Sequence, residues 1–183
     1  VHASECLQGN FVGAGFGIEQ DLTSELPEQW KEFNKKFRPV WLEKHPGKSK
    51  VSAGLACGAL WTVCKGMRKG DVVLCPDGSG TYRVGEIVSD YLYQPGEILP
   101  QRRSVHWFDT TIDRSEMSTA LKNSAGSIGT VSEITKYTDE LEPLIAGQSP
   151  SGLIATDETV EDPSVFALEK HLEDFLVKNW HQT

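Results

Sequence analysis

The glycine-rich stretch 70–88, GDVVLCPDGSGTYRVGEIV, is the first candidate for chemistry, because glycine-dense loops beside strands often hold phosphates. A phosphate loop of the type GxxxxGKS or GxxxxGKT needs a lysine that reaches the outer phosphates, and this stretch contains none. The dinucleotide fingerprint GxGxxG needs a helix after its glycines, whereas Gly78 and Gly80 lead into the strand-like run TYRVGEIV. The residues therefore predict a hairpin with DGSG as its turn, and a ligand-facing loop is the alternative.

Motifs for catalysis and metal binding are missing from the sequence. There is no GxSxG nucleophile elbow, and the five histidines have no recognisable serine or cysteine partner motif. No lysine follows an acidic residue by two positions, a spacing that is common in divalent-metal nucleases. The four cysteines form no CxxC pair and lie in mostly apolar surroundings, which indicates reduced thiols in a cytoplasmic protein. We expect no catalytic residue and no metal site in this chain.

Aromatic and basic residues share the first 110 positions, and together they favour a nucleic-acid partner. Residues 30–70 hold ten lysines and arginines but two acidic residues, whereas the net charge of −8 arises entirely from residues 111–183. Aromatic rings stack on unpaired bases for about 1–3 kcal/mol each, while basic side chains hold the backbone. Any single aromatic is better explained as part of the core, so the interpretation depends on the combination. The aromatic residues are Phe11, Phe16, Trp41, Trp61, Tyr82, Tyr91, Tyr93 and Trp107.

Two helices are predicted before the hairpin by their apolar spacing. The first covers 26–45 and should end at or before Pro39, because the residue before a proline avoids helical geometry. The second covers 48–71, with Ser52 as N-cap and Gly70 as a left-handed C-cap. Its apolar face should comprise Leu55, Ala59 or Leu60, Val63 and Met67.

The remaining pattern is that of short strands and short helices, which predicts an α+β fold with an antiparallel, partly closed sheet or barrel. Strands are expected over 5–22, 72–76, 81–88, 91–93 and 104–109, with a weaker one over 127–134. Short helices are expected over 112–123, capped by Asp113 or Ser115, and over 137–145.

Length and composition fit one soluble domain with an appendage. The chain has 183 residues with 38% hydrophobic and 24% charged residues, and no apolar run approaches the roughly 20 residues that span a bilayer. Residues 146–163 are small, acidic and without periodicity, which predicts a linker. Residues 164–183 predict a helix with a continuous apolar stripe, and this stripe must be buried against a partner surface.

Three stretches together resemble the EVE-like N-terminal domain of Mrr-type restriction proteins, which is related to the PUA-like superfamily of EVE and YTH domains. They are GNFVGAGFGIEQDLT, KSKVSAGLACGALWTVCKGMRKGDVVLCPDGSGTYRVGEIV and RRSVHWF, within residues 4–145. The tail ALEKHLEDFLVKNW resembles the helix that opens the nuclease domain of such proteins, a NucS-like endonuclease domain. The resemblance implies a PUA/EVE-like partly closed β-barrel with flanking helices over 1–145, the linker 146–163, and over 164–183 the first helix of a truncated C-terminal nuclease domain.

The resemblance also implies a pocket that accepts a flipped, modified base. Phe16 matches a position where relatives often carry tryptophan, and Asp77 would accept a hydrogen bond from an exocyclic amine or, alternatively, cap its turn. The residues expected at the base are Phe16, Trp41, Trp61, Asp77, Ser79, Tyr82 and Trp107. Those expected at phosphates are Lys48, Lys50, Lys65, Arg68, Lys69, Arg102 and Arg103, with a solvated helix face or cover of a sheet edge as the alternatives.

These expectations describe the DNA-binding specificity domain of a modification-dependent restriction endonuclease, a component of antiviral defence. Its partners would be DNA that carries a modified base and the C-terminal nuclease domain of the same polypeptide, with a homodimer left open and no membrane. No cofactor is expected in this chain, and Mg²⁺ would belong to the nuclease domain. The alternatives are a YTH-like RNA-binding module, a hydrolytic enzyme that acts on its own, and a protein-interaction module without base recognition.

Overall fold

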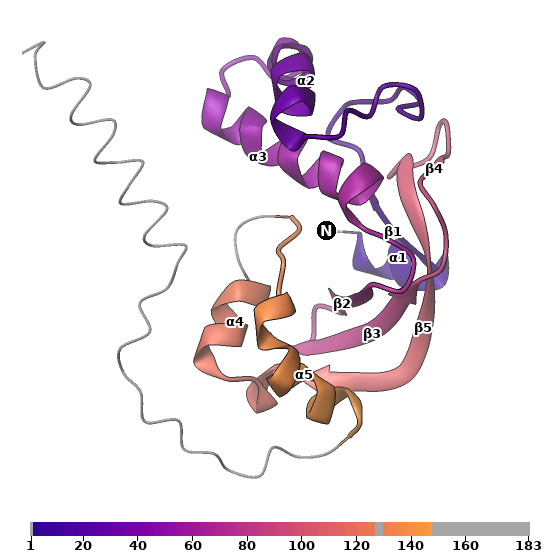
Figure 1. Cartoon of the computed structure of the whole chain (residues 1–183), viewed down its shortest axis with the longest axis vertical. Helices are drawn as coiled ribbons and strands as arrows, with labels where there is room; N and C mark the ends of the chain where they lie inside the picture. Colours follow the sequence, from indigo (N-terminus) through magenta and orange to yellow (C-terminus); the bar gives the residue numbers. More distant parts are fainter. Residues whose placement is uncertain (1, 127–129, 148–183) are drawn as a thin grey trace, which may run out of the picture. The chain divides into compact units, whose positions relative to one another are not determined.

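An antiparallel sheet curls into a half-barrel, and helices pack against it at both ends (Figure 1). This computed structural model describes residues 2–126 and 130–147. The α-helices are α1 (Ala3–Gln8), α2 (Trp30–Lys44), α3 (Lys50–Trp61), α4 (Thr119–Ala125) and α5 (Thr138–Ile145). The strands are β1 (Phe11–Ala14), β2 (Val72–Pro76), β3 (Thr81–Ile87), β4 (Leu92–Tyr93) and β5 (Gln101–Asp113). The predicted α+β class with an antiparallel, partly closed sheet is confirmed.

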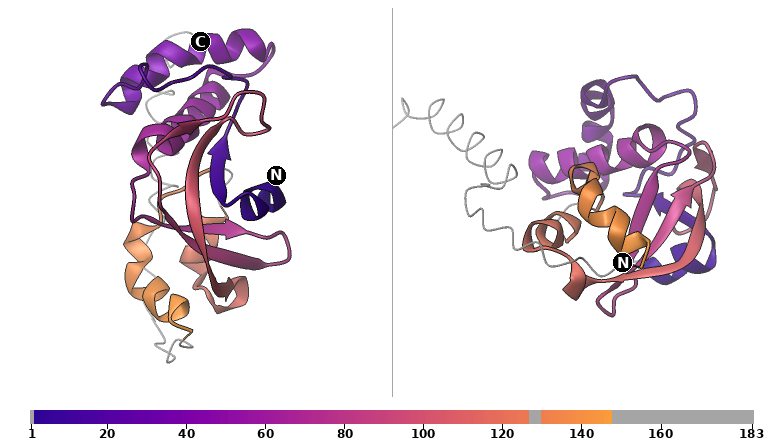
Figure 2. Two further views of the ribbon diagram at one scale, coloured as in Figure 1. Left: turned by 90° about the vertical axis from the view of Figure 1, so that its right-hand side faces the viewer. Right: turned by 60° about the horizontal axis from the view of Figure 1, so that its bottom comes forward.

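Strand β5 is the central strand of the sheet, because β1, β3 and β4 all pair with it. The strand order is β1-β5-β3-β2. Its first residues pair with β1 and with the short strand β4, and the rest of β5 pairs with β3. The register shifts between Arg83 and Gly85, and such an irregularity bends a strand and increases its twist. The bend of β5 is visible in Figure 2. One end of β5 pairs with β1, whose Ala14 belongs to one hydrophobic cluster, and Ile112 of β5 belongs to another.

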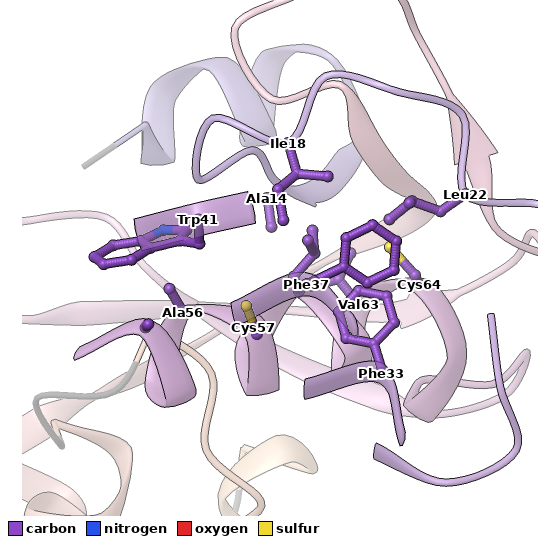
Figure 3. Packing of buried hydrophobic residues seen from close by; sticks show 12 residues of the cluster. Ala14, Ile18, Leu22, Phe33, Phe37, Trp41, Ala56, Cys57, Val63 and Cys64 are labelled. Atoms are coloured by element: carbon purple, nitrogen blue, oxygen red, sulfur yellow. The ribbon is translucent and has the colours of Figure 1, made fainter. Parts of the chain in front are cut away.

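The first cluster joins α2, α3 and the loop after β1 (Figure 3). Phe33, Phe37 and Trp41 of α2 are buried, and the ring centroids of the two phenylalanines lie 4.4 Å apart. Small side chains on α3 allow the two helices to lie close together. The buried residues of α3 and of the π-helical turn η1 (Thr62–Gly66) are Ala53, Ala56, Cys57, Ala59, Leu60, Val63 and Cys64.

The second cluster joins the other half of the sheet to α4 and α5. Its buried members are Tyr82, Val84, Ile112, Met117, Leu121, Leu141 and Leu144. A single 3₁₀ turn, η2 (Arg114–Glu116), connects β5 to α4 and is capped by Asp113, whose carboxylate accepts a hydrogen bond from the Ser115 amide at 2.7 Å. The helix predicted over 112–123 is therefore shorter and begins after Ser118, the N-cap of α4.

Two predictions at the N-terminal end are wrong. The strand predicted over 5–22 is α1 followed by β1, because Gly9 and Asn10 turn the chain between them, with Asn10 at φ 53. Helix α2 does not end at Pro39 but continues to Lys44. Pro39 lacks the N–H that would bond to the Lys35 carbonyl, and since both residues are exposed, water can satisfy that carbonyl. Buried side chains on either side of the proline hold the helix together.

The predicted caps of α3 are also wrong, whereas its predicted apolar face is wrong only at Leu55, since Ala59, Leu60 and Val63 are buried and Met67 packs against the first cluster. Ser49, and not Ser52, is the N-cap, and its hydroxyl accepts a hydrogen bond from the Ser52 amide at 3.0 Å. The helical segment ends with η1, and Gly70 lies beyond it in a turn with φ 90. Leu55 was expected in the core, yet 61% of it is exposed. The small residues of α3 pack inward because they allow a closer approach to α2 than leucine does.

The predicted hairpin is confirmed. Strands β2 and β3 pair antiparallel, and the Asp77 amide donates to the Thr81 carbonyl at 2.9 Å. Gly78 and Gly80 have φ values of 89 and 101, in the left-handed region that favours glycine. DGSG is therefore the turn itself.

The helix predicted over 137–145 is α5, preceded by the 3₁₀ turn η3 (Thr135–Tyr137). Residues 130–134, the described part of the strand predicted over 127–134, contain no strand. The predicted linker beyond residue 147 and the predicted helix over 164–183 lie outside the described residues.

Candidate nucleic-acid interface

Five cations lie on α2, in the turn before α3 and at the first residue of α3, and we call this set the basic face: Lys31, Lys35, Arg38, Lys48 and Lys50. The first three recur at i, i+4 and i+7, so they line one side of α2. The Arg38 guanidinium donates to the Lys50 carbonyl at 3.1 Å, which holds the beginning of α3 against the middle of α2. Within the described residues none of the five has a carboxylate within 4.0 Å.

The residues predicted at phosphates fall into three groups. Lys48 and Lys50 belong to the basic face. Lys65 and Lys69 form ion pairs with Glu28 and Asp90, each at 2.7 Å. Both acids are more than four-fifths exposed, so these are weak surface pairs that a phosphate can displace. Arg68 is exposed and has no ion-pair partner among the described residues.

The two arginines at the start of β5 lie on opposite faces of the strand. Arg102 lies over the Phe11 ring, with its guanidinium carbon 3.8 Å from the ring centroid, and pairs with Glu97 at 3.3 Å. Arg103 is buried, and its guanidinium donates to the carbonyls of Val63 at 2.8 Å and Cys64 at 2.6 Å. Arg103 thereby satisfies carbonyls of η1 that have left the regular helical ladder.

The residues predicted at the base do not share one pocket. Phe16, Trp41 and Trp61 all contact the first cluster. Tyr82 belongs to the second cluster, where its hydroxyl accepts a hydrogen bond from Arg114 at 2.8 Å.

Asp77 and Ser79 lie in the exposed turn of the hairpin. The Asp77 carboxylate accepts hydrogen bonds from the Ser79 amide and hydroxyl, both at 2.8 Å, and from the Thr81 amide. These bonds hold the pKa of the Asp77 carboxyl below its usual value, with the Ser79 amide as the main cause. Asp77 therefore closes its own turn, as in the alternative that the sequence left open.

Trp107 presents a partly exposed indole ring on the sheet. It is half-buried on β5, on the face that also carries Arg103 and Val105, and its indole lies over Gly85 of β3. A methyl group on Gly85 would lie 2.5 Å from the indole carbon Cε3. Within the described residues the indole Nε1 of Trp107 has no hydrogen-bond partner, and because this atom is buried only the partly exposed ring can contact a ligand. An unpaired buried donor costs about 1–3 kcal/mol.

Trp41 also has a buried, unpartnered Nε1, but its ring is enclosed. It stacks on His45 at a centroid distance of 4.1 Å. Trp61 is half-buried and donates to the Pro27 carbonyl at 3.3 Å. Among the predicted base residues, only Trp107 therefore combines a partly accessible ring with an unsatisfied donor in the described structure.

A surface hollow of about 280 Å³ lies elsewhere, between the loop after β1 and the connection from β4 to β5. It is lined by Glu19, Tyr93, Gly96, Glu97 and Pro100. Its two glutamates would repel phosphate groups, and none of the predicted base residues lines it. The hollow therefore does not fit a nucleic-acid site.

A family model described as Domain of unknown function (DUF8426) matches residues 2–135, which is more than half of the chain. The chain belongs to this family. The comparisons with curated proteins and with solved structures gave no match. The DUF8426 segment contains the half-barrel, the basic face and α4. Helix α5 follows it and still buries Leu141 and Leu144 in the second cluster.

Sequence reasoning did not place three members of the basic face of the DUF8426 domain at phosphates: Lys31, Lys35 and Arg38. Their i, i+4, i+7 spacing was the available signal, because it predicts one charged side of a helix. All three residues precede Pro39 and lie within the predicted helix, but the interpretation of the sequence used only the basic composition of residues 30–70.

The described part of the DUF8426 chain shows no group of three or more histidine, cysteine, aspartate or glutamate side chains that could hold a metal ion. None of the helices in residues 2–126 and 130–147 is long and apolar enough to cross a membrane.

Proposed function

We propose that this domain binds nucleic acid, with phosphates on the basic face and an extruded, modified base at Trp107. The observation that carries the proposal is the grouping of five cations without ion-pair partners in the described structure. Because these cations have no carboxylate partners among the residues that the structure describes, the electrostatic potential is positive here although the net charge of the protein is negative. A polyanion can bind at such a surface. Lys48 and Lys50 add to this potential at the N-terminus of α3, where the helix dipole favours anions.

The proposed contact with an extruded base is supported by the chemistry of the Trp107 side chain. A half-exposed indole provides a stacking surface that accepts any base. Together with the resemblance to EVE-like domains, this favours a DNA reader that directs a nuclease domain in restriction. RNA is the rival ligand.

The test is equilibrium binding by fluorescence anisotropy at several salt concentrations. The probes are duplex DNA with an unmodified, methylated or hydroxymethylated base, and matched RNA. If all five cations contact phosphates of duplex DNA, log K should fall with log salt at a slope of about −4 to −5. Weak, equal and salt-insensitive binding to every probe would contradict the proposal, and tighter binding to RNA would assign the surface to the rival ligand.

Lys35 and Lys36 provide a matched pair of variants. Both lie on α2 and carry the same charge, but Lys35 belongs to the basic face, whereas Lys36 pairs with Glu25. Lys35→Gln should reduce the magnitude of the salt slope by about 1, because one phosphate contact is lost. Lys36→Gln should leave the slope unchanged. Equal effects of the two variants would show that net charge, and not this face, determines binding.

Trp107→Leu tests the base contact separately. This variant should abolish the preference for one modified base and keep the salt slope, because backbone contacts do not depend on the indole. Trp30→Leu is the control, since Trp30 is 48% exposed at the start of α2 and is not among the predicted base residues. Retained discrimination in Trp107→Leu would exclude this tryptophan as the reader.

A further inference from the structure

Helix α3 is apolar on its outer side as well as on its buried side. Val51 is 72% and Leu55 is 61% exposed, and they lie one turn apart, opposite the face that packs in the first cluster. Gly58 continues the same line one turn further on. A helix that is apolar all round is normally buried on all sides. We call this line of Val51, Leu55 and Gly58 the α3 ridge.

Near Gly58, at the C-terminal end of the α3 ridge, no side chain of the described residues keeps a docking partner away from the helix backbone. A methyl group on Gly58 would meet nothing within 4 Å. One turn before it, at Gly54, a methyl group would meet only the Asn34 amide nitrogen, at 3.9 Å. Because neither glycine, at i and i+4, carries a side chain, the α3 backbone is uncovered beside Leu55, and we call this place the glycine depression. Helices use such glycine pairs to bring their backbones close.

The cations of α2 lie alongside the α3 ridge, because α2 and α3 are neighbouring helices. The Arg38 guanidinium donates to the Lys50 carbonyl at 3.1 Å, and the Asn34 amide donates to the Gly54 carbonyl at 3.4 Å. These two contacts fix α2 and α3 as antiparallel neighbours. Arg38 therefore lies beside the beginning of the ridge, and Lys31 lies beside its end. An apolar line and a cationic line thus adjoin on one surface.

We propose that the α3 ridge docks an amphipathic helix of a protein partner, one with an apolar face and acidic residues along the adjoining flank. The apolar face would cover Val51 and Leu55, and the glycine depression would admit one of its side chains. The acidic flank would lie against Lys31, Lys35 and Arg38. This is the helix-in-groove mode, in which anchors recur at i, i+3 or i+4 and i+7.

Two other occupants fit less well. A second copy of the chain, packed ridge to ridge, would bring two rows of lysine and arginine side by side, and like charges repel. An anionic membrane surface would satisfy the cations, but a bilayer gains nothing from a depression shaped by glycines. Both remain measurable outcomes of the test below.

The probe is a synthetic helical peptide with leucines at i, i+3, i+4 and i+7 and glutamates on one flank, and the control peptide carries lysines in place of the glutamates. We expect the acidic peptide to bind the whole chain at least tenfold more tightly than the control in fluorescence anisotropy. Amide chemical shift changes should be confined to α2 and α3. Leu55→Asp should weaken binding by tenfold or more, whereas Ile98→Asp, at a position 54% exposed in the β4–β5 connection, should have no effect.

Gly58→Leu provides a second, independent variant. It fills the depression, so binding of the acidic peptide should weaken several-fold. Its thermal midpoint should not fall, because the added side chain meets open space and leucine favours a helix over glycine. A variant that weakens binding without loss of stability cannot be explained by unfolding.

Equal affinity for both peptides, or binding that is insensitive to Leu55→Asp, would overturn the proposal. Concentration-dependent self-association that Leu55→Asp abolishes would assign the ridge to a second copy instead. Co-flotation with phosphatidylserine vesicles that is abolished by the same variant would assign it to a membrane. Lys31, Lys35 and Arg38 also belong to the basic face, so the acidic helix and a nucleic acid would compete for them. None of these assays contains nucleic acid, so failure of the peptide to bind and failure of nucleic-acid binding are distinguishable.

Discussion

At the residue scale, the role of a cation depends on which face of its strand it occupies. Arg102 and Arg103 are adjacent in the sequence, but alternation along β5 sends them to opposite faces. Arg102 covers an aromatic ring near the surface, whereas Arg103 donates to two carbonyls of η1. Burial lowers the pKa of the Arg103 guanidinium below its ordinary value, and a guanidinium stays charged at neutral pH.

Arg103→Ala should destabilise the fold by about 2–3 kcal/mol, because two carbonyls of η1 lose charge-assisted hydrogen bonds. Arg103→Lys should recover only part of this loss, since one ammonium group cannot reproduce the planar fork of a guanidinium. Urea unfolding measures both free energies. Arg68→Ala is the control and should change the unfolding free energy by less than about 0.5 kcal/mol, because Arg68 is exposed. Similar losses for Arg68→Ala and Arg103→Ala would contradict this role.

The Asp77 carboxylate should give a pH-dependent contribution to stability. Hydrogen bonds from Ser79 and Thr81 lower its pKa in the folded state below its value in the unfolded chain. The contribution is therefore complete above the unfolded pKa of about 3.9, and it is lost as the pH falls through the lowered folded pKa. Asp77→Ala should be less stable than the wild type at pH 7, and this difference should shrink below pH 4. Urea unfolding from pH 7 to pH 3 tests this, and a constant difference over that range would show that the charge is unimportant.

At the element scale, the sequence predicted local structure well where local chemistry decides it. The DGSG turn and the two strands beside it are specified by glycines in left-handed geometry and by alternating apolar residues. Pro39 is the opposite case, because its neighbours Phe37 and Trp41 gain enough from burial to keep the helix continuous.

The same distinction applies to the candidate site. Seven residues were predicted at the base from their type, but their positions depend on contacts between distant elements, which spacing alone does not reveal. Trp107 shows this, since its position over Gly85 follows from the pairing of β3 with β5. The basic face shows the converse. Its spacing on α2 was readable in advance, because one continuous helix decides it.

Gly85 is the point at which β3 and β5 approach most closely beneath an aromatic ring. A methyl group there would lie 2.5 Å from both Trp107 Cε3 and Val105 Cγ1. Gly85→Ala should therefore cost about 1–3 kcal/mol of stability through overpacking. Gly58→Ala is the matched control, because it meets open space on α3 and should stabilise by about 0.5–1 kcal/mol. Thermal unfolding measures both, and equal signs for the two variants would contradict the packing at Gly85.

At the scale of the whole molecule, β5 connects two hydrophobic clusters, because it pairs with β1, whose Ala14 belongs to the first cluster, and contributes Ile112 to the second. Buried Ile18 contributes to the first cluster, and buried Ile112, on β5 itself, contributes to the second. Residues 1–149 form one compact unit, and β5 pairs with β1 near one end and with β3 over the rest of its length. Neither cluster can lose its sheet without disturbing the strand on which the other depends. We therefore expect both clusters to unfold together.

Conservative core variants test this cooperativity. Ile112→Val, in the second cluster, should cost about 0.5–1.5 kcal/mol, and Ile18→Val, in the first, should cost a similar amount. Native-state hydrogen exchange should show that Ile112→Val lowers the opening free energy of the slowest amides in α3 by the same amount as in β3. Ile98→Val, at an exposed position, should change neither. If Ile112→Val lowered the opening free energy in β3 alone, the two clusters would be separate unfolding units, and β5 would not couple them.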